Sequence, residues 1–231
     1  TNPIEEIPMT PATLSVDEIE FELKAEKTRA RFGMILFLAS EAMLFAGLIG
    51  AYIVLRWTAP VWPAVGEYSY MFHMPPTMIN IIMVINTMIL IGSSFTFHFA
   101  EVAIKSGKSP AKWLFVTILM GSVFLCGQAY EWNYLIHHKH VVFQDGVYGA
   151  TFFALTGFHG VHVIVGVLLL IWTFIGVSRG KFTQERHLFF DNAGLYWHFV
   201  DIVWVGLFSL LYFDLVGHIL MPIGKVLWGL F

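Results

Sequence analysis

The sequence predicts an all-α fold, a polytopic membrane bundle of five transmembrane helices. Of the 231 residues, 57% are hydrophobic and 13% are charged, and the mean hydropathy is +0.70. Soluble domains contain about 45–50% apolar and about 25% charged residues. The apolar residues form five runs, each long enough to cross a hydrocarbon layer about 30 Å thick. We therefore expect a single membrane domain, over residues 32–215.

Residues 1–31 are expected to lie outside the bilayer. Ser15 followed by Glu18 matches a capping box, which predicts a short helix that continues through Lys27. The segment carries many acidic residues and lacks a short apolar core before a small-residue cleavage site. We therefore expect no secretory signal peptide, so the first spanning helix must direct insertion itself.

The first two spans are predicted over residues 32–55 and 77–99. The first run is interrupted only by Ser40 and Glu41. Two prolines immediately precede the second run, where they fit the start of a helix but not its interior. The connection over residues 57–76 is rich in proline and in aromatic rings, which favour the headgroup level of a bilayer. We expect this connection to be an interfacial loop.

The remaining three spans are predicted over residues 111–132, 147–177 and 192–213. Ser109 and Pro110 fit the N-cap and the first position of the third helix. Aromatic residues at the end of that helix mark the membrane interface. Five spans place the two ends of the chain on opposite sides of the membrane.

The segment over residues 134–146 contains His137, His138 and His140. We expect a solvated loop rather than a metal site, because the neighbouring residues do not complete a ligand set. The single cysteine, Cys126, excludes an internal disulfide and is expected to be a small packing residue.

Ten of the thirteen basic residues fall in three segments on one side of the predicted bundle. Positive residues near span ends are retained on the cytoplasmic side of a membrane. We therefore expect a cytoplasmic N-terminus and an outer C-terminus. Residues 216–231 are too short for a sixth span, and we expect this apolar tail to lie on the outer surface or against a partner. The ten basic residues are Lys24, Lys27, Arg29, Arg31, Lys105, Lys108, Lys112, Arg179, Lys181 and Arg186.

Two histidines stand in the otherwise apolar fourth span, in the stretch TGFHGVHVIV. His159 and His162 are three residues apart, so on a helix they share one face. The glycines around them leave room for another backbone to approach closely. A polar group at membrane depth has no water to satisfy it, so we expect partners on neighbouring helices.

Glu41, His198 and Asp201 fall at a matching depth in other spans. At a rise of about 1.5 Å per residue, these residues lie about 9–14 Å from the cytoplasmic ends of their helices. Together with the two histidines of the fourth span, they are expected to form one buried polar layer in the inner half of the bilayer. Three other polar residues fall nearer the membrane edges and outside this layer: His98, Glu101 and Glu131.

Three interpretations of the layer remain open. In the first, which we favour, the layer makes hydrogen bonds between helices: His198 and Asp201 support each other, and Glu41 is bonded to a histidine or held protonated. In the second it is a proton path, because intramembrane carboxylates and imidazoles mark such routes. In the third the chain is a haem- or metal-binding membrane protein, in which His162 and His198 ligate opposite faces of a haem.

Several classes of function are excluded by the composition. A net charge of −3 and a pI of about 6.3 offer no basic face for nucleic acid. The sequence contains no glycine-rich nucleotide loop, cysteine pair or nucleophile elbow. We therefore expect no nucleic-acid partner, and none of these three kinds of site.

Four stretches resemble subunit III of the haem-copper terminal oxidases, the cytochrome c oxidase subunit III family: GMILFLASEAMLF, GQAYEW, TGFHGVHV and YWHFVDIVW. They lie on the first, third, fourth and fifth predicted spans, and the resemblance covers residues 31–213. The five-span pattern looks like the shorter bacterial form, which lacks two additional N-terminal helices. Glu41 and Gln128 look more like the cytochrome c branch than the quinol-oxidising members or the relative associated with nitric oxide reductase.

The resemblance implies a subunit of a respiratory complex in the bacterial plasma (inner) membrane. In that complex the catalytic subunit I holds haem and copper, reduces oxygen to water and pumps protons, whereas subunit III has no cofactor and no catalytic centre. The implied partners are subunit I, other oxidase subunits and bound phospholipids. Family residues matching Glu41, His159 and His162 contact helices and lipids, and the subunit supports sustained proton uptake and turnover.

Overall fold

The computed structural model describes residues 16–58, 78–138, 142–143, 146–183 and 187–212. These residues form five α-helices, each with a stretch long and apolar enough to cross a membrane. The prediction of an all-α fold with five spans is therefore confirmed. The helices are α1 (Val16–Thr58), α2 (Met78–Lys105), α3 (Ala111–His138), α4 (Gly146–Ser178) and α5 (Leu188–Tyr212).

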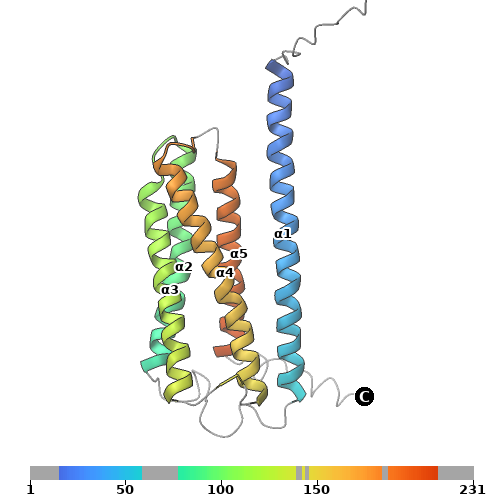
Figure 1. The fold of residues 1–231 in the computed structure, drawn as a ribbon, viewed down its shortest axis with the longest axis vertical. Coiled ribbons are helices and arrows are strands. Elements are labelled where there is room, and N and C mark those ends of the chain that lie inside the picture. The colour runs from blue at the N-terminus through green and yellow to red at the C-terminus, as the bar shows by residue number, and fades with distance from the viewer. Residues whose placement is uncertain (1–15, 59–77, 139–141, 144–145, 184–186, 213–231) are drawn as a thin grey trace, which may run out of the picture.

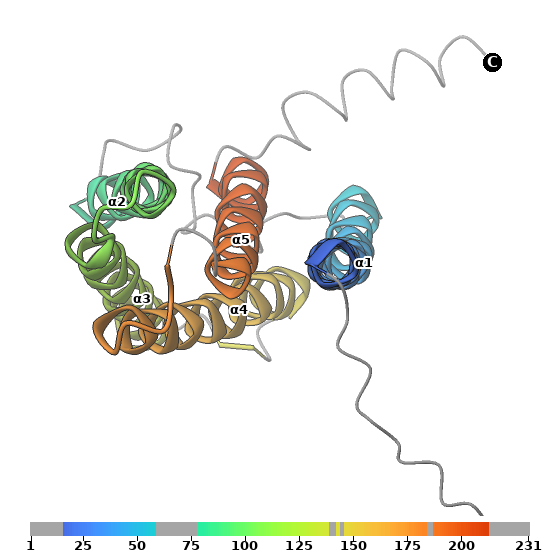
Figure 2. The same cartoon turned by 90° about the horizontal axis from the view of Figure 1, so that it is seen from above.

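Helices α2, α3, α4 and α5 form a bundle, and α1 stands beside it (Figure 1). Seen along the bundle, α2, α3 and α4 follow one another in an arc, and α5 lies on the inner side of that arc (Figure 2). Helix α1 contacts α4 and α5. Its N-terminal part extends beyond the bundle, at the end where the chain turns from α2 to α3 (Figure 1).

Helix α5 is the centre of the packing. In its apolar core 56% of the residues are buried, against at most 33% in any other helix. The fully buried ring of Trp197 lies against Gly121 of α3 and Gly166 of α4, where an added Cβ would come within 2.6 and 2.8 Å of the indole. Its Nε1–H donates to Ser93 Oγ of α2 over 3.0 Å. A single side chain therefore holds three helices around α5.

Helix α1 meets the bundle through one stripe of side chains. Glu41, Phe45 and Tyr52 recur at helical spacing, and Phe45 and Tyr52 are buried. The Tyr52 hydroxyl donates to the carbonyl oxygen of Leu210 in α5 over 3.3 Å. Only 6% of the apolar window of α1 is buried. Most of this helix therefore faces outward, where lipid or a neighbouring subunit would cover it.

Helices α1 and α3 are longer than predicted. Helix α1 runs unbroken from Val16 to Thr58, so the expected short helix and the first span are one continuous helix. No glycine or proline separates the two parts before residue 32, and a helix does not have to end where the bilayer ends. Helix α3 continues to His138, so His137 and His138 lie on its last turn rather than in a loop.

The other helix ends lie near the predicted positions. Helix α4 agrees to within one residue at each end, whereas α2 ends later, at Lys105, and α5 begins earlier, at Leu188. Gly107 adopts a positive φ of 71° in the turn after α2. Ser109 Oγ accepts a hydrogen bond from the Ala111 N–H over 3.4 Å, as expected of an N-cap.

Several predictions concern residues outside the described part of the chain. They are the capping box at Ser15, the interfacial loop from residue 59 onward, His140 and the tail over residues 216–231.

Candidate functional site

Glu41 of α1 and His162 of α4 form a pair across the contact between their helices. Glu41 Oε2 lies 2.9 Å from His162 Nε2, and the two side chains are 20% and 13% exposed. The ring of Phe45, one turn after Glu41, packs edge-on against the His162 imidazole with 4.9 Å between centroids. This polar contact therefore joins α1 to α4 within apolar surroundings.

The geometry fixes the number of protons in this pair. His162 Nδ1 lies 2.7 Å from the carbonyl oxygen of Phe158, which can only accept, so Nδ1 carries a hydrogen. The bond from Nε2 to Glu41 then requires one more proton, either on the imidazole or on the carboxyl group. Both arrangements have no net charge, which suits a site at membrane depth.

His159 lies in a cage of aromatic rings and is only 1% exposed. Its imidazole stacks on Trp204 with 4.8 Å between centroids, and it meets Phe124 and Phe45 edge to face. Neither of its ring nitrogens has a hydrogen-bond partner among the described residues. His159 therefore packs against α3 and α5, whereas His162 on the same helix is hydrogen-bonded to α1.

Ser94 of α2 joins His198 and Asp201 of α5. The Ser94 hydroxyl donates to Asp201 Oδ2 in a short hydrogen bond, and its oxygen lies 3.1 Å from His198 Nδ1. Asp201 is 5% exposed, and its Oδ1 has no partner among the described residues. His198 and Asp201 are thus bridged by a residue of another helix, where the sequence suggested direct mutual support.

The structure separates the five predicted residues into two polar pairs on different sides of α5 and a histidine enclosed by rings. Tyr196 of α5 donates to the carbonyl oxygen of His162 over 3.2 Å, so this face of α5 is turned toward α4. His198, two positions later, lies about 200° further around the helix at about 100° per residue. It therefore faces α2, and the structure does not bring His162 and His198 together as one pair of haem ligands.

A second buried carboxylate site lies near the end of α3, on Glu131. Its carboxylate accepts hydrogen bonds from the Tyr212 hydroxyl at 2.6 and 2.7 Å and from Gln128 Nε2 at 2.6 Å. The sequence placed Glu131 near the membrane edge and outside the layer, but it gave no sign that this side chain is buried. The spacing of Gln128 and Glu131, three residues apart, was the available signal of a shared polar face.

No group of three or more His, Cys, Asp or Glu side chains that could hold a metal ion occurs within the described ranges. His137 contacts the carbonyl oxygen of Asn133, one turn earlier in α3, over 3.1 Å. His138 stacks on Tyr134 with 5.0 Å between centroids. Cys126 is exposed on α3, so it does not pack in the interior of this bundle.

Comparisons with known proteins match most of the chain. The family described as cytochrome c oxidase subunit III matches residues 21–215. Cytochrome c oxidase subunit 3 of Thermostichus vulcanus is 40% identical over 183 residues, which cover 78% of this chain and 85% of that protein. The protein of the same name from Corynebacterium diphtheriae is 39% identical, over 78% of this chain and 86% of its own. The protein of that name from Loxodonta africana is 36% identical, and the match covers 79% of this chain but only 68% of the relative.

Proposed function

The chain belongs to the cytochrome c oxidase subunit III family, and we propose that it is the non-catalytic subunit III of a proton-pumping respiratory haem-copper oxidase. The match over residues 21–215 is the observation that carries this proposal, because it spans all five membrane helices. Family membership also implies that the chain associates with other oxidase subunits. In this assignment subunit I is the direct neighbour, cytochrome c is the electron donor and the bacterial plasma (inner) membrane is the location.

The proposal places haem and copper in the partner subunits. Each histidine of the predicted layer already has a different neighbour: His162 contacts Glu41, His198 contacts Ser94, and His159 is enclosed by rings. These contacts leave no facing pair of imidazoles for a haem. They favour the hydrogen-bonding interpretation over a haem protein that uses His162 and His198.

Two measurements on a chain with an affinity tag test this assignment. Purification in mild detergent should yield the chain together with a haem-containing catalytic subunit that reduces oxygen with cytochrome c. The chain stripped of all other subunits should show no Soret absorbance and no oxidase activity. A stoichiometric Soret band in the stripped chain would refute the assignment.

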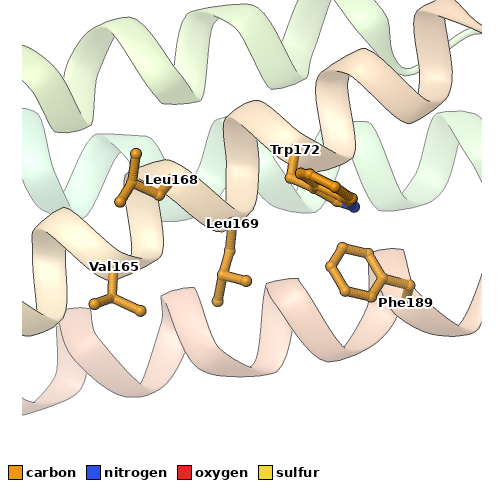
Figure 3. A pocket seen from close by; sticks show the side chains of 5 residues that line it. All are labelled: Val165, Leu168, Leu169, Trp172 and Phe189. Atoms are coloured by element: carbon orange, nitrogen blue, oxygen red, sulfur yellow. The ribbon is translucent and has the colours of Figure 1, made fainter.

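We further propose that a phospholipid acyl chain occupies an apolar groove between α4 and α5. The groove is open at the surface, has a volume of about 470 Å³ and is lined by apolar side chains: Val165, Leu168, Leu169, Trp172 and Phe189 (Figure 3). Phe182 stacks on Phe189 with 6.1 Å between centroids. Lys181 directly precedes Phe182 in the sequence, so a basic residue adjoins this aromatic pair. Its positive charge suits a lipid phosphate.

A substitution that fills the groove tests the lipid assignment. Leu168→Trp should lower the amount of phospholipid that co-purifies with the complex, because the larger ring takes up the space of the acyl chain. Leu119→Trp places the same ring at an exposed position of α3, a helix that does not line the groove, and serves as the control. Equal phospholipid content in the two variants would exclude this groove as the lipid site.

The role in proton uptake is also part of this proposal. The Glu41–His162 pair supports a structural contribution, in which α1 is held against α4 and the subunit stays attached to its neighbour. Stable attachment would then sustain proton uptake by the catalytic subunit.

A further inference from the structure

Titratable and hydroxyl side chains follow one face of α2 and one face of α5 where these two helices meet. On each helix the residues recur at intervals of three, four or seven, so they share a face. The two helices run in opposite directions, so the two rows are aligned from the α2–α3 end into the bundle (Figure 1). We call these two rows the polar seam: Ser94, His98, Glu101 and Lys105 of α2, with Asp191, His198 and Asp201 of α5 and His187 directly before α5.

Contacts across the interface join the two rows. Ser94 bridges His198 and Asp201 at the inner end, as described above. Nearer the α2–α3 turn, Glu101 Oε1 lies 3.0 Å from the position that a Cβ on Gly194 would occupy. Gly194 stands in the row of α5 between Asp191 and His198, and its missing side chain leaves room first for the buried Phe97 ring and beside it for the glutamate.

The hydrogen bonds at the inner end have a defined direction. An ionised Asp201 can only accept, so the Ser94 hydroxyl donates to it. The Ser94 oxygen then accepts from His198, which places the hydrogen of a neutral imidazole on Nδ1. His198 Nε2 is left as the acceptor of this relay.

The end of the seam near the α2–α3 turn is exposed. His98 is 62% exposed, and its Nδ1 lies 3.6 Å from Oε2 of Glu101, which is 18% exposed. His198 lies within electrostatic range of both residues. Exposure thus falls along the seam from His98 to Asp201, which is 5% exposed.

We propose that the polar seam is a proton half-channel that loads Asp201 from the aqueous phase at the α2–α3 end of the bundle. A proton that arrives through the His98–Glu101 pair binds His198 Nε2. The resulting imidazolium passes its Nδ1 proton to the Ser94 oxygen, and Ser94 passes its own hydroxyl proton to Asp201 Oδ2. The net change is one proton taken from water and one protonated Asp201, and His198 is left neutral with its hydrogen on Nε2.

The seam is separate from the other buried acids of the described chain. Glu41 is paired with His162 on the α1–α4 side, and Glu131 is enclosed by Tyr212 and Gln128 near the other end of α3. Glu131 has no imidazole in its hydrogen-bond set. It is therefore the matched control, a buried carboxyl group without a relay. The polar seam consists of side chains of this chain alone, so this inference does not depend on the proposed function.

Infrared spectroscopy of the purified complex tests the proposal. Difference spectra of wild type against Asp201→Asn and against Glu131→Gln identify the carboxylic acid bands of the two residues. After transfer to heavy water, the Asp201 band should shift about tenfold or more faster than the Glu131 band, since a relay to water bypasses local opening of the bundle. Ser94→Ala should slow the Asp201 shift to the Glu131 rate, whereas Ser94→Thr should preserve it, because threonine keeps the hydroxyl.

Three results would overturn the half-channel. They are equal exchange rates for the two bands in wild type, an Asp201 rate that Ser94→Ala leaves unchanged, and the absence of an Asp201 acid band at every pH at which the complex stays assembled. If Asp201→Asn does not assemble, isotopically labelled aspartate in the full chain assigns the band without a substitution. The comparison of wild-type rates then decides the question.

Discussion

At the scale of single residues, the buried acids of this chain differ in what surrounds them. Glu41 shares one proton with His162, Asp201 is hydrogen-bonded to Ser94, and Glu131 is bonded to Tyr212 and Gln128. A buried carboxylate without such partners would be costly at membrane depth. Each acid therefore joins its own pair of helices, and each can be tested by a substitution that retains or removes one partner.

Glu41→Gln should leave assembly, oxygen reduction and proton pumping near the wild-type values. The amide of glutamine can donate to His162 Nε2, so the interhelical hydrogen bond survives without an ionisable group. Glu41→Ala removes the partner, and interhelical hydrogen bonds in membranes contribute about 0.6 kcal/mol on average. We therefore expect Glu41→Ala to lower retention of the subunit during purification, measured as its ratio to the catalytic subunit.

The same pair of variants also tests the proton-path interpretation. If Glu41 were an obligatory proton carrier, Glu41→Gln would block pumping in a complex that is still fully assembled. Oxygen uptake and proton release in reconstituted vesicles, with subunit content checked on the same sample, distinguish these outcomes. Loss of pumping with full assembly would disprove the structural role of Glu41.

Tyr212→Phe should destabilise the full chain by about 1–3 kcal/mol, because Glu131 loses a hydrogen-bond donor in a buried position. Tyr130→Phe is the matched control, since Tyr130 is adjacent to Glu131 in the sequence but is 56% exposed. Thermal unfolding in detergent should show a lower midpoint for Tyr212→Phe and little change for Tyr130→Phe. Equal midpoints for the two variants would show that the Tyr212 hydroxyl contributes nothing to stability.

At the scale of elements, the glycines of α4 have different roles. Two of the glycines near the histidines make room for aromatic rings rather than for another backbone: Gly166 faces Trp197, and Gly157 lies against Trp132. Gly160 faces open space, with no other side chain within 4 Å of an added Cβ. Close approach in this bundle therefore depends on large side chains of α5 and α3 that fill the space above small residues.

Gly166→Ala should destabilise the purified chain by about 1–3 kcal/mol, because overpacking displaces the Trp197 ring. Gly160→Ala adds the same methyl group to the same helix without a clash, and alanine is favoured over glycine in helices by about 1 kcal/mol. We expect a lower thermal midpoint for Gly166→Ala and an unchanged or higher one for Gly160→Ala. A midpoint for Gly166→Ala at or above wild type would show that the indole moves at little cost.

At the scale of the whole molecule, the sequence predicts well how deep a residue lies in the membrane. It predicts poorly in which direction a side chain points around its helix. Hydropathy located all five spans, and counting residues placed Glu41 and His162 at levels that do meet. It could not say which way a side chain points around its helix, so His198 was grouped with His162 although the two face different neighbours. That direction depends on how the helices pack.

The sequence also does not identify the hydroxyl residues that bind the buried acids. Ser94 and Tyr212 each complete a buried polar site, yet single hydroxyls in apolar runs are common and carry little signal of their own.

The sequence also underestimates the lengths of two helices. Hydropathy reports where the bilayer ends, whereas α1 and α3 continue as helix through residues that a bilayer would exclude.

The orientation of the molecule in the membrane can be measured directly, and the structure shows which positions to label. The N-terminal half of α1 and the α2–α3 turn lie at one end of the bundle (Figure 1). Basic residues concentrate at this end, including Lys108 in the turn and Lys181 after α4. Positive residues near span ends are retained in the cytoplasm, so this end should be cytoplasmic.

Cysteine labelling in intact cells tests this orientation. Lys108→Cys and Phe143→Cys place thiols at exposed positions at opposite ends of the bundle, in a Cys126→Ser background that removes the native thiol. A membrane-impermeant thiol reagent should label the cysteine at position 143 in intact cells. It should label the one at position 108 only after the membrane is permeabilised, and the permeabilised sample shows that both thiols are reactive. Labelling at position 108 but not at 143 in intact cells would reverse the orientation, and would place the entrance of the polar seam on the outer side of the membrane.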